Sequence, residues 1–173
     1  MLDEIERELT AAVEAIESNS NSKWTRAVKS ALERIAKKHR LDCRFSDRSA
    51  GHPANWEFLC DVLWLETESG SDRHKDGYFQ NGHRIRRCIL ACEIEWSGAE
   101  DVSDRIYDFS KLLLMKAEYL LFVGEAVNQA TKTRLLSEMK AAIEACQTPP
   151  RPKSVLVGIH THGEGPAIKF CRL

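Results

Sequence analysis

Two long apolar segments, separated by a polar stretch with three glycines, constrain this fold more than any other feature of the sequence. Residues 56–66 read WEFLCDVLWLE and residues 85–96 read IRRCILACEIEW. Both are apolar enough to predict buried strands of a central sheet. The stretch between them predicts a long loop or an extended hairpin tip, because it holds few apolar groups and Gly70, Gly77 and Gly82.

Carboxylates interrupt both apolar segments. Asp61 is the only charge in the interior of the first, and a buried carboxylate costs several kcal/mol unless it is paired or bound to a metal. In the second segment, alternation predicts one wholly apolar face made of Cys88, Leu90, Cys92, Ile94 and Trp96. The opposite face ends in two carboxylates, Glu93 and Glu95, after Ile85, Arg87, Ile89 and Ala91. Three acids therefore gather in the predicted sheet.

The rest of the chain predicts helices and strands around this sheet. Residues 2–16 predict a helix, and a second begins near Asn21 or Ser22 with the buried stripe Trp24, Val28, Ala31 and Ile35. A short strand is expected in LDCRFSD, followed by the two apolar strands. Further elements are a helix at 102–116, a strand at 119–123, a helix at 126–146, and strands at 154–159 and 167–171. This order predicts an α/β fold with a mixed sheet.

Composition restricts the class of protein. A length of 173 residues predicts a single domain, and 43% hydrophobic with 29% charged residues is typical of a globular protein. No apolar run approaches the ~18 residues of a membrane span, and MLDEIERELT is acidic where a signal peptide is basic, so we expect a cytoplasmic protein without membrane contact. The six cysteines show no CxxC spacing and predict reduced core thiols.

Charge is distributed unevenly along the chain despite a net charge of −1. Residues 1–17 carry six acids and one base, whereas residues 23–48 carry nine bases and three acids. A second basic cluster comprises Arg73, Lys75, Arg84, Arg86 and Arg87. Such asymmetry allows a phosphate-binding face on a nearly neutral protein, and the alternative is a set of solvated helix faces.

The acids of the two strands suit a hard divalent cation. Mg²⁺ is usually held by one or two carboxylates, waters and substrate phosphate, and Asp61 and Glu93 are the natural pair of ligands. Glu95 would orient the attacking water or bind a second ion, and the metal would lower the pKa of that water. The alternative is that the two glutamates emerge into solvent at the strand end and pair with Arg87 or a neighbour.

At these residues the chain resembles the PD-(D/E)XK restriction-endonuclease-like superfamily, which has an αβββαβ core with an Asp in the second strand and (D/E)-x-K ending the third. The matching residues are Asp61 in FLCDVLWLE and Glu93-Ile94-Glu95 in ACEIEW, followed by DFSKLLLMKAEYLLFVGE. The resemblance covers roughly residues 22–125 of a single domain spanning 1–173. Residues 1–20 would be an N-terminal helical extension, and residues 126–173 a C-terminal helix and strands.

This resemblance implies a metal-dependent nuclease that hydrolyses phosphodiester bonds, with DNA as the favoured substrate and Mg²⁺ or Mn²⁺ as cofactor. Asp61 and Glu93 would bind the metal, with Glu95 as a third ligand or water-orienting group. Two positions depart from the pattern: Cys60 stands where proline is usual, and Glu95 stands where lysine is expected. In some members the following helix supplies that lysine, which makes Lys111 the candidate here.

The helical wheel bears on Lys111. A buried stripe of Val102, Ile106, Phe109 and Leu113 would leave Lys111 on the opposite side, facing water. Leu112, Leu114 and Met115 make the helix apolar nearly all round, however, and leave its orientation open.

Other functions stay open at this level. The glutamate at position 95 also suits a non-catalytic member of the same fold that binds nucleic acid or a protein partner. A third reading is a protein that dimerises through residues 1–17, and a stand-alone nuclease of this size would often act as a homodimer or in a larger complex. The segment His160-Thr161-His162-Gly163-Glu164 has a zinc-like histidine spacing, but its glycines predict a surface turn.

Overall fold

A computed structural model of the chain describes residues 1–16, 20–46, 60–69, 83–96, 102–147, 152–165 and 167–173. The helices in these ranges are α1 (Leu2–Glu14), α2 (Asn21–Lys38), α3 (Ser103–Leu113) and α4 (Gln129–Ala145). The strands are β1 (Asp42–Phe45), β2 (Val62–Ser69), β3 (His83–Glu95), β4 (Ala117–Ala126), β5 (Ser154–Thr161) and β6 (Ile168–Arg172). The predicted order of elements is confirmed throughout, and so is the α/β class.

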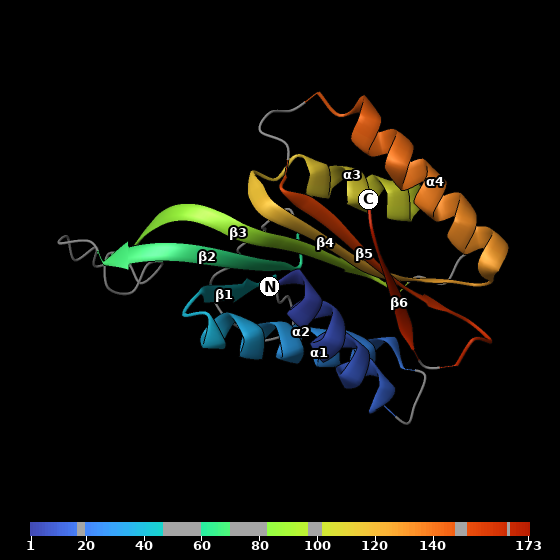
Figure 1. The fold of residues 1–173 in the computed structure, drawn as a ribbon, viewed down its shortest axis with the longest axis horizontal. Helices are drawn as coiled ribbons and strands as arrows, with labels where there is room; N and C mark the ends of the chain where they lie inside the picture. The colour runs from blue at the N-terminus through green and yellow to red at the C-terminus, as the bar shows by residue number, and fades with distance from the viewer. Residues whose placement is uncertain (17–19, 47–59, 70–82, 97–101, 148–151, 166) are drawn as a thin grey trace.

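The strands form one mixed sheet in the order β1-β2-β3-β4-β5-β6. The β3–β4 and β4–β5 pairs are parallel and the other pairs are antiparallel. Because α3 and α4 are the crossovers of the parallel strands, both lie on one face of the sheet, and α1 and α2 cover the other (Figure 1). The carboxyl ends of β3, β4 and β5 therefore meet at the same edge.

Each face of the sheet has its own hydrophobic core. Under α1 and α2, the strand residues Trp64, Leu90 and Cys92 pack with helix residues that include the predicted stripe Trp24, Val28, Ala31 and Ile35, all of them buried. Under α3 and α4, the core contains Phe109, Leu112, Leu120, Phe122 and Leu135. A sheet buried on both faces explains why its central strands are so apolar in sequence.

The alternation predicted for β3 holds only for its second half. Trp64 pairs with Leu90, but the next residue, Leu65, pairs with Cys88, so Ile89 is an extra residue in the strand. This β-bulge turns Ile89 into the α1/α2 core beside Leu90 and leaves Cys88 packed against the α3/α4 core. The prediction that Cys88 shares a face with Leu90 was therefore wrong, whereas Leu90, Cys92, Ile94 and Trp96 do share one.

The six cysteines are free thiols, as predicted. Cys60 and Cys92 are buried, and the other four are partly buried. Burial raises the pKa of Cys60 and Cys88 to about 12, so neither is a ready nucleophile at neutral pH. Among the helices in the described parts of the chain, none is both long and apolar enough to cross a membrane.

Candidate metal centre

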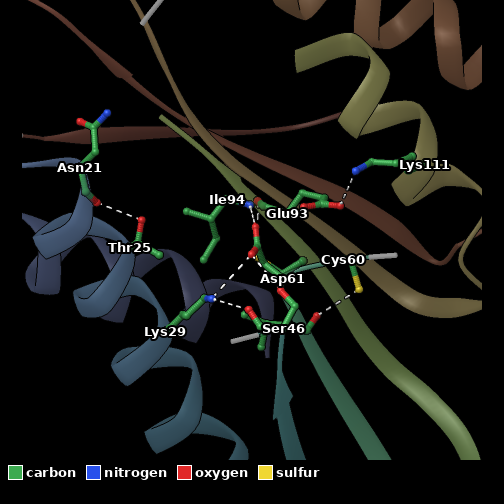
Figure 2. A network of polar contacts seen from close by, with 11 residues as sticks. Asn21, Thr25, Lys29, Ser46, Cys60, Asp61, Glu93, Ile94 and Lys111 are labelled. Carbon is green, nitrogen blue, oxygen red and sulfur yellow. Dashed lines mark hydrogen bonds and ion pairs between the residues drawn. The ribbon is translucent and has the colours of Figure 1, made fainter. Parts of the chain in front are cut away.

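Strand register brings the two predicted metal ligands together. Val62 at the start of β2 pairs with Cys92 near the end of β3, so the next position of the same antiparallel register sets Asp61 opposite Glu93. Directly opposed residues of an antiparallel pair have Cβ atoms about 5 Å apart. The sequence predicted a strand over 56–66 with Asp61 in its interior, and this was wrong for Asp61, because β2 begins one residue later. Residues 56–59 of that predicted strand lie outside the described residues. Figure 2 shows both carboxylates at this end of the sheet.

The Asp61 carboxylate is held by two hydrogen-bond donors and one ion pair. Its Oδ2 accepts a hydrogen bond of 2.9 Å from the backbone N–H of Ile94, and its Oδ1 accepts one of 3.1 Å from the Ser46 hydroxyl. The Lys29 Nζ lies 3.6 Å from Oδ1 (Figure 2). The Asp61 carbonyl also accepts from the Ser46 N–H at 3.0 Å, which continues the β1–β2 ladder beyond its last pair. These contacts offset the cost of a carboxylate that is only 25% exposed.

Glu93 has the opposite environment. Its side chain is 9% exposed, and its buried Oε1 has no hydrogen-bond partner in the described part of the structure. The nearest cation is the Lys111 Nζ, 3.6 Å from Oε1. Burial, followed by the negative charge of Asp61, raises the pKa of Glu93 from 4.5 to about 8, although the Lys111 charge opposes this rise. Glu93 is therefore mostly protonated at neutral pH.

Lys111 reaches the site from α3, contrary to the helical-wheel expectation that it faces water. Val102 and Phe109 of the predicted stripe are buried, but Ile106 and Leu113 are only partly buried. Arg105 and Leu112 are buried instead, so the buried side of α3 is shifted from the predicted stripe toward these two residues. Lys111 is 30% exposed, and its Nζ lies 2.6 Å from Asp108 Oδ1, one turn earlier on α3. Asp108 thus fixes the lysine that faces Glu93.

Glu95 ends β3 on the same face as Glu93 and lies opposite Gly124 of β4. A Cβ at position 124 would approach the Glu95 carbonyl oxygen to 2.8 Å, so glycine permits the close contact of the two strands here. Across the residues that the structure describes, no three acidic, histidine or cysteine side chains are grouped closely enough to hold one ion. The role of Glu95 as a third ligand stays a prediction.

The pair formed by Asp61 and Glu93 nevertheless fits a hard divalent cation. Two carboxylates suffice when waters and a substrate phosphate complete the coordination shell. Two features of this acidic pair favour added positive charge: the buried Glu93 Oε1 has no hydrogen-bond donor among the described residues, and burial, followed by the negative charge of Asp61, raises the pKa of Glu93 and so disfavours its ionised form. A cation between them would relieve both.

Several residues of the predicted basic clusters pair with acids. Ion pairs join Lys37 to Glu33, Lys38 to Glu4, Arg44 to Asp42, Arg86 to Glu66 and Glu68, and Arg87 to Glu66 and Glu118. Arg48, Arg73 and Lys75 lie outside the described residues, and the side chain of Arg84 is not described. In this structure Lys29 is the member of the first cluster that touches the candidate ligands.

The turn predicted at His160–Glu164 is confirmed only from His162 onward, because His160 and Thr161 are the last residues of β5. The turn carries a contact that the sequence did not indicate. The His162 Nε2 lies 2.8 Å from Oε2 of Glu125, a buried residue of β4. Sequence reasoning also missed Ser46 and Asp108 and did not single out Lys29. Ser46 and Lys29 reach Asp61 from other elements, so no spacing signal marks them. The i,i+3 spacing of Asp108 and Lys111 on one helix is a signal that could have found Asp108.

Comparison with models of protein families, with curated proteins and with solved structures finds no match for this chain.

Proposed function

We propose that this protein is a metal-dependent nuclease that hydrolyses phosphodiester bonds of nucleic acid, with DNA as the favoured substrate and Mg²⁺ or Mn²⁺ as cofactor. The observation that carries the proposal is the convergence of Asp61 and Glu93 at one end of the sheet, with Lys111 3.6 Å from the buried Glu93 Oε1. The run α2-β1-β2-β3-α3-β4 supports it, because this is the αβββαβ order of the superfamily that the motif resembles.

In this proposal each residue has a distinct task. Asp61 and Glu93 would bind the cation, which when bound lowers the pKa of a coordinated water and neutralises phosphate charge. Glu95, at the same strand end, would orient the attacking water. Lys111 would stabilise negative charge near Glu93, and Asp108 would keep its ammonium in place. The burial of Glu93 excludes bulk water from this side of the site.

The second candidate is a non-catalytic domain of the same fold that binds nucleic acid or a protein partner. The bonds of Asp61 favour it, because Ile94 and Ser46 already give both of its oxygens a structural use. The glutamate at position 95, where the superfamily pattern has lysine, also favours the non-catalytic candidate. Assembly into a homodimer or larger complex is compatible with either candidate.

The decisive experiment is calorimetric titration of Mn²⁺ into the wild-type protein, Asp61→Ala and the control Glu138→Ala. Glu138 is an exposed acid on α4, so its loss removes one carboxylate without touching the site. We expect Mn²⁺ binding by the wild type and by Glu138→Ala, and none by Asp61→Ala. Cleavage of DNA in Mg²⁺ or Mn²⁺ should follow the same pattern. Circular dichroism of each variant establishes that it is folded.

Two results would contradict the proposal. A folded Asp61→Ala protein with full metal-dependent cleavage would show that the site is elsewhere. If the wild type binds no Mn²⁺ even when the titration is repeated with DNA present, the non-catalytic candidate is favoured instead. The repeat matters because a substrate phosphate can complete a coordination shell that the protein leaves unfinished.

A further inference from the structure

Two lysines flank the acidic pair from opposite faces of the sheet. Lys29 approaches Asp61 from α2, and Lys111 approaches Glu93 from α3, each with its Nζ 3.6 Å from a carboxylate oxygen (Figure 2). The sequence motif has no lysine of its own on β3, because position 95 is glutamate. The site therefore contains two cations that can act in place of the missing one.

The two lysines differ in what else holds them. Lys111 has a second, closer acid, Asp108, at 2.6 Å. Among the described residues, Lys29 otherwise contacts only a neutral group, the Ser46 carbonyl oxygen at 3.4 Å. A divalent cation on Asp61 and Glu93 would neutralise the acids that attract both lysines. Lys111 would then keep Asp108, whereas Lys29 would lose the one charged partner that it has among the described residues.

Two hydrogen bonds fix the position of Lys29, one made by Asn21 at the start of α2 and one made by Lys29 itself. Asn21, two turns earlier, donates from Nδ2 to the carbonyl oxygen of Trp96 at 2.9 Å, just beyond the end of β3. Lys29 itself donates to Ser46 at the end of β1. Its side chain is 21% exposed, so the ammonium remains accessible to a ligand.

We propose that Lys29 contacts a phosphate oxygen of the nucleic-acid backbone when a divalent cation occupies the acidic pair. This inference rests on the proposed function and names a substrate-contacting residue for the same site. Ligands of one Mg²⁺ ion lie about 2.1 Å from it, so a phosphate oxygen bound with Asp61 to one ion would lie within about 4 Å of the Asp61 oxygen. That is the region which Lys29 already approaches. Lys111, retained by Asp108, would remain a positioning residue for Glu93.

The test separates metal binding from phosphate binding. Mn²⁺ affinity is measured by calorimetry without DNA, and affinity for a short DNA duplex is measured in Ca²⁺ by fluorescence anisotropy at several salt concentrations. The variants are Lys29→Gln, Lys29→Arg and the control Lys153→Gln. Lys153 pairs with Glu118 and lies just before β5, at the amino ends of the parallel strands, whereas the site lies at their carboxyl ends. The control variant therefore removes an equal charge away from the site.

We expect Lys29→Gln to keep Mn²⁺ affinity within about threefold and to weaken DNA binding about tenfold, with a salt slope shallower by about one. Lys29→Arg should restore most of the DNA affinity, and Lys153→Gln should match the wild type. The inference is overturned if Lys29→Gln binds DNA as the wild type does, or if it loses Mn²⁺ binding, which would make Lys29 a structural support of Asp61. Either result leaves the proposed function standing. A wild-type protein that binds neither Mn²⁺ nor DNA would overturn both proposals.

Discussion

Asp61 and Glu93 carry the same functional group at the same end of the sheet, yet their surroundings are opposite. Asp61 is 25% exposed and accepts from a backbone N–H and a hydroxyl, with Lys29 nearby. Glu93 is 9% exposed, and its buried Oε1 has a lysine at 3.6 Å but no hydrogen-bond donor in the described structure. Hydrogen bonds therefore hold Asp61 in place, whereas burial disfavours the ionised form of Glu93.

One pair of carboxylates can therefore combine two properties: hydrogen bonds fix the orientation of Asp61, and Glu93 has a buried oxygen without a donor that a cation could contact. The donors of Asp61 fix its orientation whether or not a metal is present. Glu93 is stable as a neutral acid in the metal-free protein, since burial and the Asp61 charge raise its pKa to about 8. Metal binding would therefore release a proton from Glu93 at neutral pH.

The largest predicted effect concerns the pH dependence of stability. Between pH 4.5 and about 8, folded Glu93 retains a proton that the unfolded chain has lost. The free energy of unfolding should therefore fall as pH rises through this window, by on the order of a few kcal/mol from this residue. Chemical denaturation of the metal-free protein and of Glu93→Gln across the window measures it.

The difference between the two proteins isolates Glu93 from other groups. Glu93→Gln should lack this contribution, so its stability relative to the wild type should rise with pH. Glu4, whose pKa is lowered to about 2 by Lys38 and His39, titrates below the window and is common to both proteins. Parallel stability curves for the wild type and Glu93→Gln would contradict the buried, protonated state of Glu93.

A smaller effect is expected at Asp61. Asp61→Ala removes the acceptor of the Ile94 N–H and of the Ser46 hydroxyl, and should reduce the free energy of unfolding by about 1–3 kcal/mol. Ser46→Ala removes only the hydroxyl bond and should cost about 0.5–1.5 kcal/mol. Urea denaturation at pH 7 compares the two. If Asp61→Ala were as stable as the wild type, the contrast between the two carboxylates would not hold.

The smallest expected effect tests Lys111. Its positive charge opposes the rise in the pKa of Glu93, so Lys111→Met should raise that pKa above about 8. NMR titration of the Glu93 side-chain carboxyl carbon in the metal-free protein measures the shift. Lys153→Met is the matched control, because Lys153 lies just before β5, at the end of the parallel strands opposite to the site. An unchanged midpoint in Lys111→Met would show that the lysine does not act on Glu93.

The order of the helices and strands could be predicted from the sequence, because hydrophobic periodicity and turn residues are local signals that survive in any α/β arrangement. The same signals singled out Asp61 and Glu93, because each interrupts one of the two apolar segments, although Asp61 lies one residue before β2 in the structure. The stripe of α2 was predictable for the same reason. The superfamily resemblance rests on this order and on three residues, so it suggested a site without fixing its geometry.

The surroundings of those acids depend on long-range packing. The bulge at Ile89 shifts the β2–β3 register, and register is set by packing across the sheet and not by the strand's own alternation. The rotation of α3 about its axis brings Lys111 to Glu93. It depends on which apolar side of the helix packs against the sheet, and the sequence left that choice open. Lys29 and Ser46 meet Asp61 only because α2 and the end of β1 converge there, at separations of 32 and 15 residues that no local pattern encodes.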